Sequence, residues 1–156
     1  MADAERQVAC RNRKARHDYH IEETIETGIA LSGSEVKALR LGKANLTDAY
    51  AAVRKGQLWL LKAKIEPYEQ ANRANHLLDR ERKLLAHRHE INRLEGKLRA
   101  KGLTLIPLAI YFKGSWAKVE LGLARGKREY DKRHDIADRD SKRELQRITK
   151  RRAQGR

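Results

Sequence analysis

Residues 103–124 read LTLIPLAIYFKGSWAKVELGLA, and this stretch decides the fold class. Two apolar runs flank a short polar segment around Gly114, a residue that permits a tight turn. In the second run, Val119, Leu121 and Leu123 occupy alternate positions, which is the period of a strand with one buried face. The stretch therefore predicts an antiparallel β-hairpin.

More hairpin and strand patterns precede this one. Residues 44–63 predict a second hairpin, because alternating apolar residues lead into and out of a turn at Lys55-Gly56. Three shorter strand patterns, the first two separated by an expected turn at Gly28, lie at residues 17–25, 29–31 and 83–85. About six short strands with glycine turns predict a small antiparallel barrel. Side chains fill the interior of such a barrel, so a ligand binds on its outside.

Two helices are predicted between these strands. The first, residues 32–42, begins with the S-x-x-E capping box of Ser32 and Glu35. The second, residues 87–101, ends at Gly102 and carries one apolar stripe. The apolar positions of that stripe are Ile91, Leu94 and Leu98.

Charge separates the chain into three expected parts: a flexible N-terminal arm (1–11), a barrel (12–126) and a basic C-terminal tail (127–156). The whole chain of 156 residues has a formal net charge of +15. The tail holds 12 Lys or Arg residues against 6 Asp or Glu, with few large apolar residues. It has too little apolar surface to offset its ordering entropy, so we expect it to be disordered when free. It lacks Pro and is rich in helix formers, so an anionic partner should make it helical.

Composition narrows the classes of function. No apolar run approaches the ~20 residues that cross a bilayer, and no apolar N-terminal stretch resembles a signal peptide. The single cysteine, Cys10, cannot form an intrachain disulfide. Leu145 and Ile148 make too thin a stripe for the tail to bind membranes. We therefore expect a cytoplasmic, soluble protein that binds nucleic acid. Its aromatic content of 5% favours a folded RNA recognised by shape and backbone.

Six histidines allow an enzyme to be considered. His87 and His89 are two residues apart on a predicted helix and should point away from each other, which disfavours a metal site. No H-E-x-x-H, C-x-x-C or glycine-rich phosphate loop occurs. We therefore expect no catalytic residue, metal or cofactor. A small ribonuclease that uses His17 or His20 stays an alternative.

Residues 12–19 read NRKARHDY and resemble the opening of the SmpB family, the tmRNA-binding (SsrA-binding) proteins of bacterial ribosome rescue. Blocks that also resemble the family follow in order: GSEVKALR at 33–40, RKLL at 82–85, KVEL at 118–121 and YDKRHDI at 130–136. The resemblance implies an oligonucleotide-binding (OB) type barrel that binds the tRNA-like domain of tmRNA. With elongation factor Tu, such proteins deliver alanyl-tmRNA to stalled ribosomes. The tail then occupies the decoding centre and the empty mRNA channel as a helix. The alternative is a general OB-type RNA-binding or ribosome-associated protein without tmRNA specificity.

The resemblance also implies roles for individual residues. Glu26, Leu85 and Lys118 match RNA-binding positions: Glu26 would accept hydrogen bonds from RNA hydroxyls or base amines, and Lys118 would contact a phosphate. The sequence by itself favours core packing for Leu85. Backbone contacts to RNA are expected from Lys37, Arg40, Lys43 and Asn45.

The remaining implied roles concern the small-subunit rRNA. His17 matches a family histidine near the decoding centre. Gly126 is the expected pivot between the barrel and the tail. At the root of the tail, Asp131, Lys132 and Arg133 match the family's D-K-R motif. Lys127 and Arg128 belong to the same expected contact with the ribosome. Apolar contacts of the induced helix are expected from Leu145 and Ile148.

Overall fold

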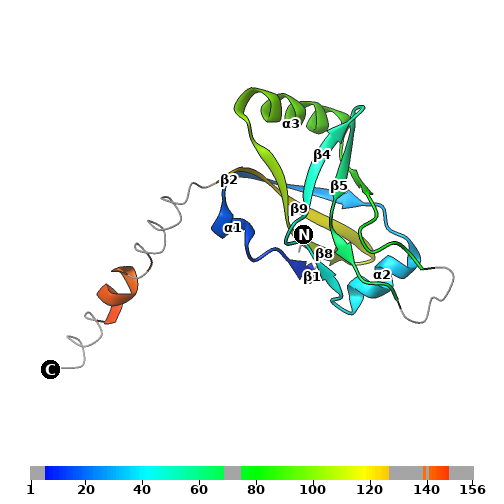
Figure 1. Cartoon of the computed structure of the whole chain (residues 1–156), viewed down its shortest axis with the longest axis horizontal. Coiled ribbons are helices and arrows are strands. Elements are labelled where there is room, and N and C mark those ends of the chain that lie inside the picture. Colours follow the sequence, from blue (N-terminus) through cyan, green and yellow to red (C-terminus); the bar gives the residue numbers. More distant parts are fainter. Residues whose placement is uncertain (1–5, 69–74, 127–138, 140, 148–156) are drawn as a thin grey trace. The chain divides into compact units, whose positions relative to one another are not determined.

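A computed structural model describes residues 6–68, 75–126, 139 and 141–147 (Figure 1). The chain divides into two units, residues 1–126 and 127–156, and each is described by itself. The first unit contains, in chain order, β1 (Arg6–Arg11), α1 (Ala15–Asp18), β2 (Tyr19–Ile29), α2 (Gly33–Arg40), β3 (Ala44–Asn45), β4 (Tyr50–Arg54), β5 (Gln57–Leu61), β6 (Lys64–Ile65), β7 (Arg82–Leu85), α3 (Arg88–Lys101), β8 (Thr104–Lys113) and β9 (Trp116–Gly126).

The strands of the first unit form a closed antiparallel ring, which confirms the predicted small barrel. Their order is β1-β8-β4-β5-β7-β2-β9. Because β8 also pairs with β9, the six strands from β8 to β9 close into a ring. Strand β1 lies outside the ring and pairs with residues 109–113 of β8. The two residues of β3 and the two of β6 make a small separate sheet that the sequence did not predict. The interior is filled by aliphatic side chains, among them Leu58, Leu60, Leu105, Ile110 and Leu121.

Both predicted hairpins are confirmed. In the β8–β9 hairpin Gly114 has φ +59°, and in the β4–β5 hairpin Lys55 and Gly56 have φ +52° and +72°. Strand β8 is buried on both faces, because its outward side packs into a second apolar cluster. That cluster comprises Ala15, Ile106, Leu108 and Ala124.

Both predicted helices are confirmed. The capping box of Ser32 and Glu35 begins α2. Gly102 ends α3 with φ +60°, and Ile91 and Leu94 on that helix are buried. Within the described ranges, every helix is too short or too polar to cross a membrane.

The N-terminal segment departs from the prediction. We expected a flexible arm over residues 1–11, but Arg6–Arg11 form β1, paired with β8. The strand has no clear apolar pattern in the sequence, because few of its side chains are buried. Cys10 lies in the core, Ala9 packs against that core, and Val8 is 41% exposed. The four-residue helix α1 was also not predicted, and the strand expected from residue 17 begins at Tyr19.

The expected turn at Gly28 is wrong, because β2 continues through it to Ile29. The reason for the glycine is a close approach between strands. A Cβ added at Gly28 would lie 3.2 Å from the Cβ of Leu85 on β7. A side chain there would push β7 away from β2, so the glycine serves the pairing of two strands.

In the second unit, residues 139 and 141–147 are helical. We had expected order in this tail only on an anionic partner. Residues 141–147 contain neither Pro nor Gly and consist mostly of good helix formers, so the sequence permits a helix here. The other tail residues lie outside the described part.

Candidate nucleic-acid interface

Three of the predicted RNA-binding residues meet around one glycine. Gly28 on β2 pairs with Leu85 on β7 and with Lys118 on β9, so these residues form one row across three strands. Glu26 precedes Gly28 by two residues and points to the same side of the sheet. The register of the barrel therefore brings together residues that are 92 positions apart in the sequence, from Glu26 to Lys118.

Exposed apolar side chains extend this row. Leu85 is 51% exposed, so it is a surface residue and not the core residue that its type suggests. Tyr111 pairs with both Lys118 and Val8, which places Val8 in the same row. Trp116 lies two residues before Lys118 on β9 and is 73% exposed. We call the surface formed by Val8, Glu26, Leu85, Trp116 and Lys118 the outer face.

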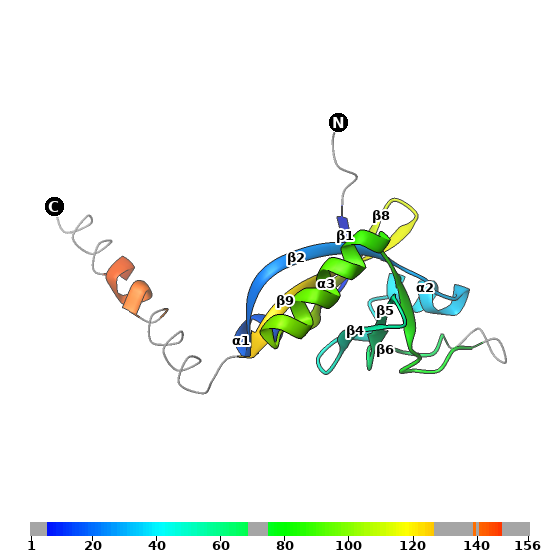
Figure 2. The same cartoon turned by 90° about the horizontal axis from the view of Figure 1, so that it is seen from above.

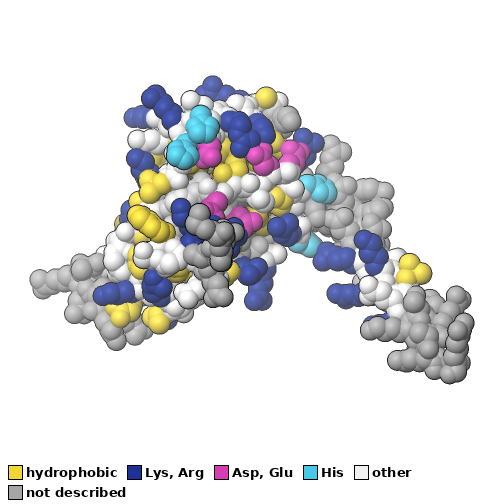
Figure 3. All heavy atoms as spheres, turned by 180° about the vertical axis from the view of Figure 1, so that it is seen from behind, with side chains coloured by type: hydrophobic (Ala, Val, Ile, Leu, Met, Phe, Trp, Pro, Cys, Tyr) yellow, Lys and Arg dark blue, Asp and Glu magenta, His cyan; other side chains and the backbone are white. Residues whose placement is uncertain are grey.

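The outer face has a mixed character. Strands β1, β2 and β8 lie on the far side of Figure 1, as the view from above shows (Figure 2). Figure 3 looks onto that side, where Lys and Arg side chains surround small groups of acidic ones and hydrophobic side chains reach the surface beside them. Exposed apolar groups next to cations suit a ligand that presents both bases and phosphates.

Glu26 already has several partners in the protein. The hydroxyl of Tyr111 donates a short hydrogen bond to its carboxylate. The Nζ atom of Lys113 lies 2.9 Å from Oε2, and the Nη2 atom of Arg6 lies 3.4 Å from it. Arg6 also stacks over the Tyr111 ring, 4.5 Å from its centroid. The carboxylate therefore collects two cations and a hydroxyl at the outer face.

These contacts set the protonation of the cluster. Burial by itself would raise the pKa of Glu26, but the hydrogen bonds from Tyr111 and Lys113 outweigh it and lower the pKa below its ordinary value. Burial and the hydrogen bond to Glu26 raise the pKa of Tyr111, so the phenol keeps its proton and donates. The resemblance implied that Glu26 accepts hydrogen bonds from RNA; in the structure its carboxylate contacts Arg6 and Lys113.

The other residues predicted to contact the RNA backbone lie outside the row through Gly28: Lys37 and Arg40 on α2, Lys43 between α2 and β3, and Asn45 on β3. The guanidinium of Arg40 stacks 4.3 Å from the centroid of the Phe112 ring. The ammonium of Lys37 lies 5.5 Å from the centroid of the Tyr68 ring. Asn45 accepts hydrogen bonds from the backbone N–H and the hydroxyl of Thr47, at 2.8 and 2.6 Å. Asn45 thus caps a local turn, and Lys43 beside it is exposed.

A buried ion cluster behind the interface was missed by sequence reasoning. Glu35 makes the expected capping contacts, but its carboxylate also accepts hydrogen bonds from Arg80, at 2.5 Å, and from Arg82. Arg82 is fully buried and also donates to the carbonyls of Ala63 and Arg80, at 2.8 and 2.9 Å. This cluster fixes β7, and with it Leu85, against α2. Arginine is rarely fully buried, so its residue type predicts an exposed position. No feature of the sequence indicated that Arg82 is buried.

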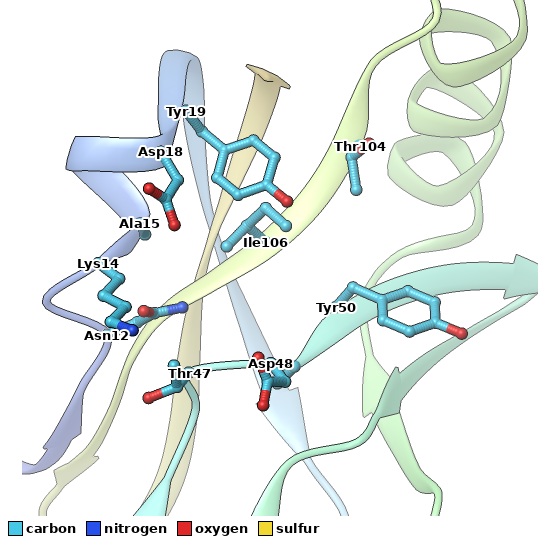
Figure 4. Close-up of a pocket in the computed structure, with 11 residues that line it drawn as sticks. Asn12, Lys14, Ala15, Asp18, Tyr19, Thr47, Asp48, Tyr50, Thr104 and Ile106 are labelled. Atoms are coloured by element: carbon cyan, nitrogen blue, oxygen red, sulfur yellow. The ribbon is translucent and has the colours of Figure 1, made fainter. Parts of the chain in front are cut away.

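A polar cavity of about 340 Å³ lies beside α1. Asp18 and Tyr19 line it on one side, and Thr47, Asp48 and Tyr50 line it on the other (Figure 4). The cavity wall is fixed by Asn12, whose Nδ2 donates to the carbonyls of Leu46 and Pro107 at 3.1 and 3.0 Å. Its Oδ1 is buried and has no hydrogen-bond partner among the described residues.

The histidines are placed as follows. His17 is exposed on α1, with its Nδ1 3.0 Å from Oδ1 of Asp18, and His20 lies in β2. His87 and His89 do not point apart: their rings stack with centroids 5.5 Å apart. His87 has extended backbone and precedes the helix, so the helical spacing does not apply to it. Among the described residues no group of three His, Cys, Asp or Glu side chains is arranged to hold a metal.

The tail positions are only partly visible. Gly126 is the last residue of β9 and pairs with Tyr19. Leu145 lies in the helical stretch and is 64% exposed. The remaining predicted tail positions fall outside the described residues: Lys127, Arg128, Asp131, Lys132, Arg133 and Ile148.

Comparisons with known proteins identify the family of this chain. A model of the family "SmpB protein" matches residues 9–151. The SsrA-binding protein of Carboxydothermus hydrogenoformans is 58% identical over 139 residues, covering 89% of this chain and 93% of the relative. That of Symbiobacterium thermophilum is 60% identical over 148 residues, covering 94% and 93%.

A solved structure gives the same result. One chain of the structure described as "tmRNA-SmpB: a journey to the center of the bacterial ribosome" is 52% identical to this chain, with a TM-score of 0.66. The match covers 81% of this chain and 93% of that one. Because the family model spans nearly the whole sequence and each of these relatives shares more than half of the aligned residues, this chain belongs to the SmpB protein family.

Proposed function

We propose that this protein binds the tRNA-like domain of tmRNA through its outer face and, with elongation factor Tu, delivers alanyl-tmRNA to stalled ribosomes. Its tail would occupy the decoding centre and the empty mRNA channel. In this role the protein is a cytoplasmic RNA-binding factor and does not catalyse a reaction. The names of its relatives support tmRNA as the partner, and the solved relative supports the ribosome.

The observation that carries the proposal is the row through Gly28. An exposed leucine on β7 and an exposed tryptophan and a lysine on β9 lie on the two strands that flank β2 in one barrel. A folded RNA offers unstacked bases and a phosphate backbone, and these match apolar and cationic side chains respectively. The side chains of the outer face are held by paired strands, so little ordering is required on binding.

Binding of the isolated tRNA-like domain tests the outer face. Leu85→Ala and Lys118→Ala should each weaken binding about tenfold, consistent with the loss of ~1–3 kcal/mol per well-placed contact. Leu77→Ala and Lys64→Ala are matched controls, since both residues are exposed and lie on neither β2, β7 nor β9. Equal affinities for all four variants and the unmodified protein would rule out the outer face as the binding surface.

A deletion of residues 127–156 tests the role of the tail. The shortened protein should bind the tRNA-like domain with unchanged affinity but fail to support peptide tagging in a reconstituted translation reaction. Tagging at the full rate by the shortened protein would show that the tail has no role in it.

The alternative, a general RNA-binding protein, is favoured by the wide distribution of basic residues, which include Lys37 and Arg40 on α2 and Lys43 between α2 and β3. Competition separates the two functions. At physiological salt, an unrelated structured RNA should displace the tRNA-like domain only at a much higher concentration if the protein is specific. Displacement at equal concentration would favour the general function.

A further inference from the structure

A groove adjoins the outer face at Leu85. Gly56 from the β4–β5 turn and Gln57 at the start of β5 line it, and its volume is about 420 Å³. Three cationic side chains also line it, from three different elements: Lys55 from the β4–β5 turn, Lys83 from β7 and Arg88 from the start of α3. We call this site the basic groove. No acidic residue is among the residues that line it.

Several other cations of the barrel form ion pairs with carboxylates. Arg6 and Lys113 pair with Glu26, and Arg93 and Lys97 pair with Glu23. Even Arg54, next to the turn, pairs with Glu81. Lys55, Lys83 and Arg88 form no ion pair with any residue in the described part of the chain. Their charges are therefore available to a ligand.

The backbone at Lys55 fixes the point from which its side chain starts. Lys55 has φ +52°, a left-handed conformation in a hairpin turn that Asn, Asp or Gly adopts at lower cost. The turn itself does not require a lysine. This position holds the start of the side chain rigidly at the rim of the groove, because Lys55 is fixed between paired strands β4 and β5.

The chemistry of the groove identifies its ligand. The lining residues include three unpaired cations but no carboxylate and no aromatic ring, and this composition suits phosphate groups. Among the lining side chains, only the amide of Gln57 could accept a hydrogen bond from a base amine. We propose that the basic groove binds backbone phosphates of the RNA strand that continues from the outer face past Leu85. This proposal rests on the proposed function, because it assumes an RNA on the outer face.

Salt dependence of binding tests the groove. Each phosphate that a protein neutralises adds about 0.7–0.9 to the slope of log affinity against log salt concentration. The full-length triple variant Lys55→Gln, Lys83→Gln, Arg88→Gln is measured with the tRNA-like domain as the ligand. The magnitude of its slope should be smaller by about 2. A lower affinity with an unchanged slope would not support phosphate binding. The triple variant Lys62→Gln, Lys64→Gln, Arg99→Gln removes the same charge from exposed positions outside the groove and should keep the slope. Equal slopes for the two variants would overturn the proposal.

One additional double variant, together with the outer-face variants, separates failure of the groove proposal from failure of the proposed function. Lys55→Arg and Lys83→Arg together preserve the charge and should retain the slope of the unmodified protein; a slope as low as that of the glutamine variant would contradict phosphate binding. If Leu85→Ala and Lys118→Ala weaken binding but the groove variant keeps its slope, only the groove proposal fails. If an unrelated RNA competes at equal concentration while the groove variant loses slope, the tmRNA proposal fails and phosphate binding stands.

Discussion

At the scale of single residues, the most consequential contact is the buried ion cluster of Glu35 and Arg82. Burial by itself would raise the pKa of Glu35, but hydrogen bonds from Arg80 and the Ser32 backbone, together with the charge of Arg82, lower it to about 2. A carboxyl with a lowered pKa stabilises the folded state above its unfolded pKa, and that stability is lost as pH falls towards the folded value. The loss should therefore occur between about pH 5 and pH 2.

We predict that Glu35→Gln lowers the free energy of unfolding at pH 7 by about 3–5 kcal/mol, because it leaves the Arg82 charge buried without its partner. The variant should also lose less stability than the unmodified protein as the pH falls from 5 to about 2.5. Urea denaturation at a series of pH values measures both effects. Glu81→Gln is the control, since Glu81 is 56% exposed and its pair with Arg54 is solvated. Identical results for the two variants would contradict the role of the cluster.

At the scale of elements, α3 contains one glycine that is unfavourable and ends at another that is required. Gly96 is exposed in the helix interior, and a Cβ there would meet no atom within 4 Å. Gly102 ends the helix with φ +60°, where a side chain is strained. We predict that Gly96→Ala raises the free energy of unfolding by about 0.5–1 kcal/mol and that Gly102→Ala lowers it by about 1 kcal/mol. Thermal unfolding measures the two shifts, and shifts of the same sign would show that helix geometry does not control stability here.

At the scale of the whole molecule, the two ends of the chain should contribute differently to stability. β1 pairs with β8 and carries Cys10 into the core, whereas residues 127–156 form a separate unit. Deletion of residues 1–11 should therefore lower the midpoint of thermal unfolding by several degrees, while deletion of residues 127–156 should leave it unchanged. Differential scanning calorimetry of the two shortened proteins makes the comparison. An unchanged midpoint without residues 1–11 would mean that β1 adds nothing to the fold.

The candidate site was predicted only in part. The resemblance supplied Glu26, Leu85 and Lys118, and the charge of the chain supplied RNA as the class of ligand. The exposure of Leu85 could not be predicted, because a leucine in a short apolar strand is usually buried. The contacts of Glu26 with Tyr111, Lys113 and Arg6 were also not predictable, since they depend on which strands lie next to each other.

The sequence by itself determined the two long hairpins, both longer helices and the basic character of the chain. These features depend on local patterns: alternation along a strand, an apolar stripe along a helix, a capping box, and glycines with positive φ. Tertiary structure alone decided that Arg6–Arg11 form a strand, that β2 continues through Gly28, and that Arg82 is buried against Glu35. Those outcomes rest on pairing between residues far apart in the chain, and a local pattern carries no information about a distant partner.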